Sequence, residues 1–203
     1  MTLQKFVNDV SPELTRDAQF RSISDIPSAM LTPGSTVRLF PGTYDPVSGV
    51  NGVNLSFVGV GDREEIIVGG FTFSNSSTGT LTFENMTVKG PNAITTAAAG
   101  KCIEVTGVHA DTACNVLVRH CTLSNSNVGI MSHTAGTVAV EYSDLTGVDK
   151  AIRANGAIAI KFSHLTCAAN ANAYADSNHT VIRAVTLVAA HITTSPTSNG
   201  ATT

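Results

Sequence analysis

The sequence has no tryptophan, three tyrosines and eight phenylalanines among its 203 residues. Charged residues make up 13% of the chain, about half the share of an average soluble domain. The formal net charge of −3 gives no electrostatic basis for binding nucleic acid or an anionic membrane. No run approaches the roughly 18 apolar residues of a membrane-spanning helix, and residues 1–10 lack the apolar core of a secretory signal. We therefore expect synthesis in a cytoplasm and no membrane partner.

Cysteine is also scarce, and the chain contains no Cys-x-x-Cys pair. The four cysteines are Cys102, Cys114, Cys121 and Cys167. Without a secretory signal, the sequence predicts reduced, buried thiols. A Cys102–Cys114 disulfide and a metal site that includes His120 remain alternatives. We expect no cofactor and no metal.

The chain does contain one repeated sequence motif of about ten residues, called here the phrase. It is clearest in VLVRHCTLSN (116–125), VAVEYSDLTG (138–147) and IAIKFSHLTC (158–167). With its first residue called p, the copies begin at Val37, Leu55, Leu81, Val116, Val138, Ile158 and Thr180. Intervals of about 18 to 35 residues are typical of repeat architectures. Side chains at p and p+2 share one side of a strand, and a large residue points inward again at p+7. Asp62 breaks the p+7 pattern, which predicts an irregular corner in the second copy.

A second strand follows in several copies, and it places one large residue inward. Those residues are Ile103, Ile130, Ile152 and Tyr174. An antiparallel sandwich would also give short strands at this spacing. Its hairpin partners would reverse the order of the columns, whereas a parallel solenoid stacks like residue over like about 4.8 Å apart. The aligned columns therefore favour the solenoid.

The repeated phrase resembles the right-handed parallel β-helix of the pectin-lyase-like superfamily. The segment FRSISDIPSAMLTPGSTVRLFPGTY (20–44) is similar to the entry of that fold. The resemblance implies an all-β, single-stranded solenoid of about seven coils with a short helical N-terminal cap. We expect three regions: an arm and cap at 1–34, the β-helix at 35–192 and a tail at 193–203. Ser11-Pro12-Glu13 predicts a helix start within the first region.

Enzymes of this superfamily carry recognisable acidic motifs, which suggests where chemistry should be sought. The NTD, DD, GHG and RIK motifs of galacturonases and the paired aspartates and arginine of pectin esterases are not found. The nearest group is Asp144, Asp149, Lys150 and Arg153, for which surface ion pairing is the expected role. The ring column at p+4, formed by His120, Tyr142 and Phe162, is expected to be structural. The sequence thus predicts no catalytic residue.

The outward positions p+1 and p+3 of the repeat indicate a contact surface. Position p+3 is charged in the later copies: Glu84, Arg119, Glu141, Lys161 and Arg183. Position p+1 becomes apolar or small there: Leu117, Ala139, Ala159 and Val181. An outward apolar stripe bordered by charge is typical of a contact surface. We therefore predict an oligomer interface made of Leu117, Ala139, Ala159, Val181, Glu141, Lys161 and Arg183.

These features together predict a non-enzymatic structural protein of a virion. The chain is similar to small trimeric β-helix proteins that decorate or cement the capsids of tailed bacteriophages. This resemblance implies a homotrimer on the virion surface, made in the host cytoplasm. The major capsid protein or another virion protein would bind the N-terminal arm. The alternative is a polysaccharide-active enzyme or a glycan-binding module, similar to a tail-associated depolymerase.

Overall fold

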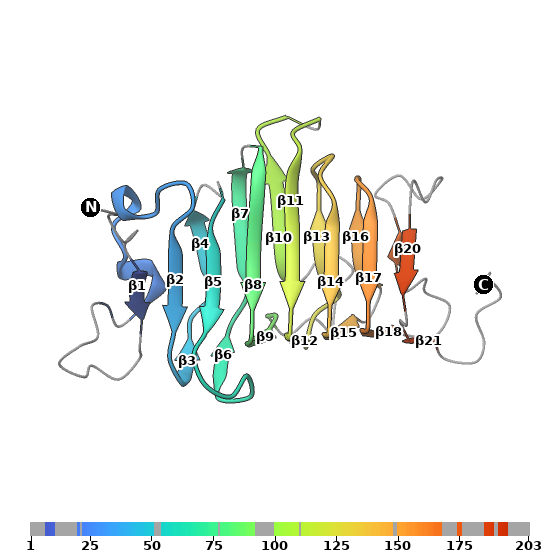
Figure 1. Ribbon diagram of the computed structural model, residues 1–203, viewed down its shortest axis with the longest axis horizontal. Helices are drawn as coiled ribbons and strands as arrows, with labels where there is room; N and C mark the ends of the chain where they lie inside the picture. The colour runs from blue at the N-terminus through green and yellow to red at the C-terminus, as the bar shows by residue number, and fades with distance from the viewer. Residues whose placement is uncertain are drawn as a thin grey trace.

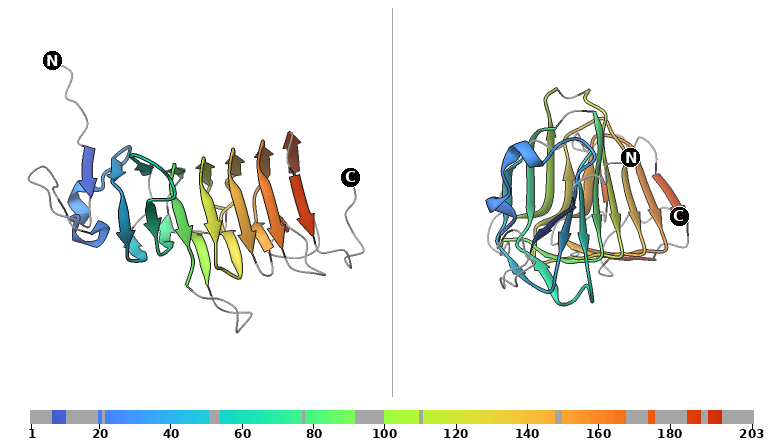
Figure 2. Two further views of the ribbon diagram at one scale, coloured as in Figure 1. Left: turned by 90° about the horizontal axis from the view of Figure 1, so that it is seen from below. Right: turned by 60° about the vertical axis from the view of Figure 1, so that its left-hand side comes forward.

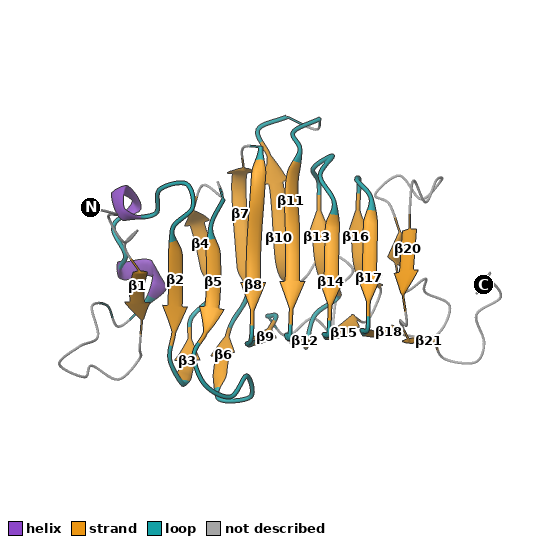
Figure 3. Cartoon of the chain, viewed as in Figure 1, coloured by secondary structure: helices purple, strands orange, loops and turns teal. Residues whose placement is uncertain are grey.

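The computed structural model places the strands in three parallel sheets that wrap around one core (Figure 1). The residues that it describes are 7–10, 20, 22–50, 54–76, 78–91, 100–109, 111–147, 150–167, 174–175, 185–188 and 191–194. Nearly all of the regular structure drawn is strand (Figure 3). Two short 3-10 helices, η1 (Ile23–Asp25) and η2 (Ser28–Met30), lie near the N-terminal end.

Each coil contributes at most one strand to each sheet. The eight-stranded sheet contains β1 (Val7–Val10), β2 (Thr36–Leu39), β5 (Ser56–Gly59), β8 (Gly79–Glu84), β11 (Cys114–Arg119), β14 (Val138–Glu141), β17 (Ile158–Lys161) and β20 (Val185–Val188). The seven-stranded sheet contains β3 (Gly42–Tyr44), β6 (Ile66–Val68), β9 (Thr87–Lys89), β12 (Thr122–Ser124), β15 (Asp144–Gly147), β18 (His164–Cys167) and β21 (His191–Thr194). The six-stranded sheet contains β4 (Val47–Val50), β7 (Phe71–Ser76), β10 (Lys101–Gly107), β13 (Val128–Ser132), β16 (Lys150–Ala154) and β19 (Tyr174–Ala175).

The coils follow one another along a single axis, with β1 and β20 at opposite ends (Figure 2). The predicted class, an all-β parallel solenoid, is confirmed. The number of coils differs slightly from the predicted seven, since six coils contribute a strand to all three sheets among the described residues. The end coils are less regular than the central ones, since β4 pairs with β7 through a register shift and β19 is only two residues long.

The stacked columns predicted for the central coils are confirmed. At position p, Leu81 pairs with Val116, Val116 with Val138, and Val138 with Ile158. In the six-stranded sheet, Ile103, Ile130, Ile152 and Tyr174 stand in one register. Alternation along each strand buries one face, so that β11 and β14 alternate buried and partly exposed residues.

Phenylalanine supplies much of the core near the N-terminal end. Phe57, Phe71, Phe73 and Phe83 are all at most 1% exposed. Their ring centroids lie 4.8 to 6.1 Å apart, in tilted and stacked pairs. Such pairs add about 0.5–1.5 kcal/mol each beyond the burial of their area. This cluster ties the eight-stranded sheet to the six-stranded sheet.

In the first copy, the predicted alignment of the first strand is wrong by two residues, although Tyr44 does stand in the p+7 column. Val37 pairs with Phe57 and therefore occupies p+2, while Ser35 takes position p. Ser35 is buried there, and its hydroxyl donates to the carbonyl oxygen of Met30 at 3.1 Å. A slip of two residues keeps the same side chains inward, so alternation alone does not distinguish the two registers.

The last copy is also shifted from its predicted place. Val185, and not Thr180, pairs with Ile158, so Leu187 takes p+2 and Ile192 takes p+7. In the second copy, Val68 fills the p+7 column in place of Asp62, because a longer corner separates β5 from β6. The irregular corner predicted there is confirmed.

The N-terminal segment holds one strand that the sequence did not reveal. β1 pairs in parallel with β2 and extends the eight-stranded sheet beyond the first coil. Ser22 caps η1, since its hydroxyl accepts the backbone N–H of Ser24 at 3.3 Å. The helix start predicted at Ser11 lies outside the described residues.

Candidate functional site

The predicted interface residues that the structure describes lie in one continuous register on the outside of the eight-stranded sheet. Leu117 pairs with Ala139, and Ala139 with Ala159, across β11, β14 and β17. Glu141 and Lys161 stand in register two residues further along their strands. All three members of the stripe are partly exposed.

Two members of the predicted interface need correction. Val181 and Arg183 lie outside the described residues, and the register of β20 assigns their columns to other residues. Thr186 pairs with Ala159, so the p+1 column ends in a threonine and not in a valine. Val188 pairs with Lys161, so the p+3 column ends in an apolar residue and not in an arginine.

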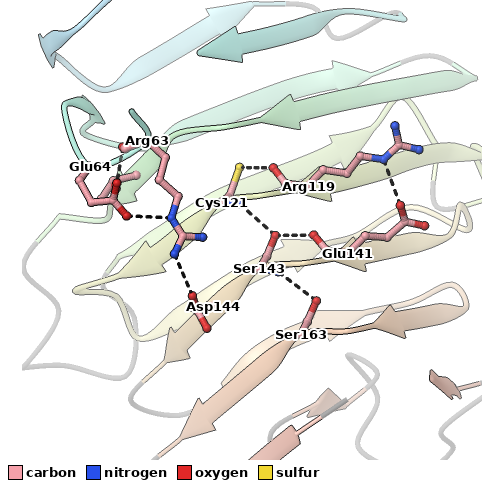
Figure 4. Close-up of polar contacts among 9 residues, drawn as sticks. Arg63, Glu64, Arg119, Cys121, Glu141, Ser143, Asp144 and Ser163 are labelled. Carbon is pink, nitrogen blue, oxygen red and sulfur yellow. Dashed lines mark hydrogen bonds and ion pairs between the residues drawn. The ribbon is translucent and has the colours of Figure 1, made fainter. Parts of the chain in front are cut away.

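Beside the stripe runs a ladder of ion pairs. The Nε atom of Arg119 lies 3.1 Å from Oε2 of Glu141, and Nζ of Lys161 lies 3.4 Å from Oε1 of the same carboxylate (Figure 4 shows the first pair). Arg119 and Lys161 are 42% and 49% exposed, whereas Glu141 is 20% exposed. Exposed ion pairs stabilise a fold by roughly 0–1 kcal/mol, so this ladder shapes the surface more than it holds the fold.

The ring column at p+4 forms the corner between the eight-stranded and seven-stranded sheets. His120 stacks on Tyr142 and Tyr142 on Phe162, each with ring centroids 5.1 Å apart and planes within 11°. Tyr142 and Phe162 are 50% exposed, and Val108 is the other large apolar residue exposed among those the structure describes. The predicted stack is confirmed, and it borders solvent along its whole length.

The backbone at this corner is left-handed in four successive coils. Residues at p+4 have φ of 57° at Asn85, 50° at His120, 50° at Tyr142 and 47° at Phe162. Asparagine tolerates this region, and Asn85 uses its amide to donate to the carbonyls of Gly59 and Gly61 at 3.1 and 2.8 Å. Aromatic residues there are strained, and they persist only where surrounding contacts hold them.

Buried hydrogen bonds behind the rings provide those contacts. Ser143 Oγ accepts the N–H of Cys121 at 3.0 Å, and Ser163 Oγ accepts the N–H of Ser143 at 3.1 Å (Figure 4). Each serine hydroxyl also donates backward, to the carbonyls of Glu141 and Lys161 at 2.8 and 2.7 Å. Cys121 occupies the equivalent place one coil earlier, and burial raises the pKa of its thiol to about 12. These hydrogen bonds hold the corner in place, and burial disfavours the thiolate form of Cys121.

The charged group that the sequence places on one coil consists of Asp144, Asp149, Lys150 and Arg153. Asp144 begins β15, and its Oδ2 lies 3.3 Å from an Nη atom of Arg63 (Figure 4). Arg63 comes from the long corner of the second coil and also pairs with Glu64 at 2.9 Å. Lys150 is buried in β16, and Asp149 lies outside the described residues. Asp144 does form a surface ion pair, but its partner lies 81 residues away and outside the predicted group, and it carried no sequence signal.

A second polar cluster lies on the six-stranded sheet. Oε1 of Glu104 lies 3.2 Å from Nζ of Lys101 and 3.7 Å from Nε2 of His133. The sequence pattern does not point to these residues. They lie on the second strand of each coil, where the repeat is visible only at the inward positions. Glu104 resembles Glu141 in having two basic neighbours in its own chain.

Cys102, Cys114 and Cys121 are free and buried, as predicted, and nothing is described of the Cys167 side chain. No group of three His, Cys, Asp or Glu side chains within the described ranges could hold a metal ion. No helix in those same ranges is long and apolar enough to cross a membrane.

The comparisons with known proteins agree with this geometry at the level of fold. No protein-family model and no curated protein matches the sequence. Among solved structures, the chain is similar to Escherichia coli YbhC, with a TM-score of 0.59 and 14% identity over 82% of this chain and 57% of YbhC. The chain thus shares the parallel β-helix fold of YbhC and spans 57% of the length of that protein. That fold class includes enzymes, so the fold alone does not define the activity.

Proposed function

We propose that this chain is a non-enzymatic structural protein of a virion, which decorates the capsid surface as a symmetric oligomer. The supporting observation is the outward face of the eight-stranded sheet. There, the column of Leu117, Ala139 and Ala159 lies beside the ion-paired column, and the exposed aromatic column follows on the far side of the charges. Regular apolar and small residues on a flat sheet face allow close side-by-side packing, and closed symmetry leaves no free face.

The proposal keeps the roles expected from the sequence. The major capsid protein or another virion protein is the partner of the N-terminal arm, and the protein is made in the host cytoplasm before it joins the virion. A homotrimer is the form implied by the resemblance to capsid cement proteins. The face described above supports self-association, while the number of copies is a separate prediction.

Imaging of the native particle tests this function. An antibody or a small fusion tag on the protein should label the outer shell of purified virions in a regular lattice. Protein that is found free in the lysate and never on particles would refute the proposal. The purified chain should also release neither unsaturated nor reducing ends from acidic polysaccharides, with or without calcium. Release that disappears in an Asp144→Asn variant would establish the enzymatic alternative.

A glycan-binding module is the second candidate, and the exposed rings of Tyr142 and Phe162 favour it. Sugars bind aromatic residues through the ring face. Here each face of Tyr142 is covered by a neighbouring ring 5.1 Å away, which leaves mainly ring edges to solvent. Binding of oligosaccharides that is lost in Tyr142→Ala would favour this candidate over the structural role.

A further inference from the structure

Across six consecutive strands of the eight-stranded sheet, the residues in register at p+3 form a symmetric pattern. Its members, in spatial order, are Val58, Glu84, Arg119, Glu141, Lys161 and Val188. The four central positions alternate in charge, and an apolar residue stands at each end. When the column is reversed, every negative charge falls on a positive one and valine falls on valine. The centre of this pattern lies between β11 and β14.

We infer that this face binds a second copy of the same chain in antiparallel orientation, about a two-fold axis that passes between Arg119 and Glu141. The inference rests on the proposed function and specifies the partner of that surface. Arg119 then faces Glu141 of the second copy, and Glu84 faces Lys161 of the second copy. A two-fold interface uses the same patch on both chains, so each contact occurs twice. The column meets this requirement at all of its positions.

The neighbouring p+1 column has the same symmetry in size. Its members are Ser56, Thr82, Leu117, Ala139, Ala159 and Thr186. The same axis places Leu117 against Ala139 of the second copy, so that the largest side chain of the column meets a small one. Small polar residues, Ser56 and Thr186, occupy the equivalent register positions at the two ends. Shape and charge therefore agree on one axis position.

The aromatic column lies at the edge of this face, one residue beyond the charges. The axis sets His120 beside Tyr142 of the second copy, while the half-exposed ring of Phe162 meets Asn85. Contact there would bury ring edges that the monomer leaves in solvent, and aromatic residues are enriched at interfaces for this reason. In a parallel threefold arrangement, equal coils lie at equal heights, so a charged column placed at the threefold axis would meet like charges at each level. The charge pattern thus favours the two-fold over the threefold packing expected from the sequence.

The size of the contact sets its strength. Five steps of about 4.8 Å give a strip about 24 Å long and on the order of 10 Å wide. Such a strip is well below the roughly 800 Å² that each partner buries in a standard stable interface. We therefore expect a weak dimer that forms at high protein concentration and dissociates as salt screens its charges. In an assembled particle, neighbouring copies are held close together, and a weak contact suffices.

Sedimentation velocity over a concentration series tests the charge pattern. Wild-type protein should dimerise, and Glu141→Arg should weaken dimerisation at least tenfold because the axis doubles each like-charge contact. The double variant Arg119→Glu/Glu141→Arg should recover it, since residue 119 of each copy again faces an opposite charge at residue 141 of the other. Glu104→Arg is the matched control, because Glu104 also has two basic neighbours but lies on the six-stranded sheet. Dimerisation that responds equally to Glu141→Arg and Glu104→Arg overturns the inference.

A zero-length carbodiimide crosslink tests the orientation in the native protein. Glu84 and Lys161 are separated by three coil steps, about 14 Å, within one chain, so an amide between them should form only between copies. In a mixture of ¹⁴N- and ¹⁵N-labelled protein, the Glu84–Lys161 crosslink should carry mixed labels. A stable trimer without this crosslink, or a monomer at every concentration, overturns the two-fold inference. Imaging of the virion decides the proposed function separately, since a trimer on the capsid would retain it and a dimer absent from particles would not.

Discussion

The strained corner predicts that replacing alanine by glycine changes the free energy of unfolding in opposite directions at two positions only a few residues apart. Tyr142 has a φ of 50° and stacks between two rings, whereas Ala139, three residues earlier, lies in the extended strand β14. We consider Tyr142→Ala, which removes the ring and keeps a Cβ, and Tyr142→Gly, which also removes the Cβ. Ala139→Gly serves as the matched control for glycine in a regular strand.

The magnitudes follow from the two stacked pairs and the left-handed backbone. Each aromatic pair contributes about 0.5–1.5 kcal/mol, so Tyr142→Ala should lower the free energy of unfolding by about 1–3 kcal/mol. A left-handed backbone costs an L-residue about 1–2 kcal/mol, which glycine avoids. Part of that gain is offset by the greater entropy of glycine in the unfolded chain, which leaves Tyr142→Gly about 1 kcal/mol more stable than Tyr142→Ala. Ala139→Gly should instead lower stability by about 0.5–1 kcal/mol.

Equilibrium unfolding in urea at low protein concentration measures these differences, since the weak dimer does not form there. The decisive comparison is the effect of replacing alanine by glycine, which should stabilise at position 142 and destabilise at position 139. If glycine destabilises at both positions, the strain assigned to the corner is not present. If Tyr142→Ala unfolds at the same urea concentration as wild type, the ring stack contributes nothing to the fold.

Three further predictions concern the core. Phe83→Ala should cost about 3–5 kcal/mol by urea unfolding, because its ring packs against three others in a buried cluster, and a cost below 1 kcal/mol would contradict that packing. Ile160→Asp should prevent folding, since it buries an unpaired charge. Lys161→Ser, on the opposite face of the strand, should melt within a few degrees of wild type. A normally folded Ile160→Asp protein would refute the register. Cys121 should resist thiol reagents at pH 8 in the folded protein, because burial raises its pKa to about 12 and keeps the thiol protonated. It should react once the protein is unfolded. Fast labelling of Cys121 in the folded protein, measured by mass spectrometry, would show that the thiol is accessible.

The central coils could be predicted because their sequence signals agree with one another. Between Leu81 and Lys161, alternation, the p+7 leucines and the second-strand isoleucines all specify the same register. The ring stack followed from the same alignment, since His120, Tyr142 and Phe162 share one column. Its left-handed backbone could not be predicted, because aromatic residues are not the usual signal for that conformation.

The end coils could not be aligned because their patterns are degenerate. Ile182 and Leu187 are five residues apart, and so are Leu187 and Ile192, so Leu187 suits either the p+7 or the p+2 position. The register of β20 selects the second option, and with it Thr186 and Val188 replace Val181 and Arg183 in the outward columns. In the second coil, the contact of Arg63 with Asp144 depends on where a long corner folds, which alternation does not encode.

The unbroken register of β8, β11, β14 and β17 limits how such a solenoid can lengthen. Duplication of the single coil that carries Glu141 would preserve every buried column and add about 4.8 Å. It would also set two glutamates side by side on the outside, where like charges oppose each other. Duplication of the two coils that carry Arg119 and Glu141 would maintain the alternation. Growth by recombination should therefore add coils in pairs, so that the length of the protein changes in steps of about 10 Å.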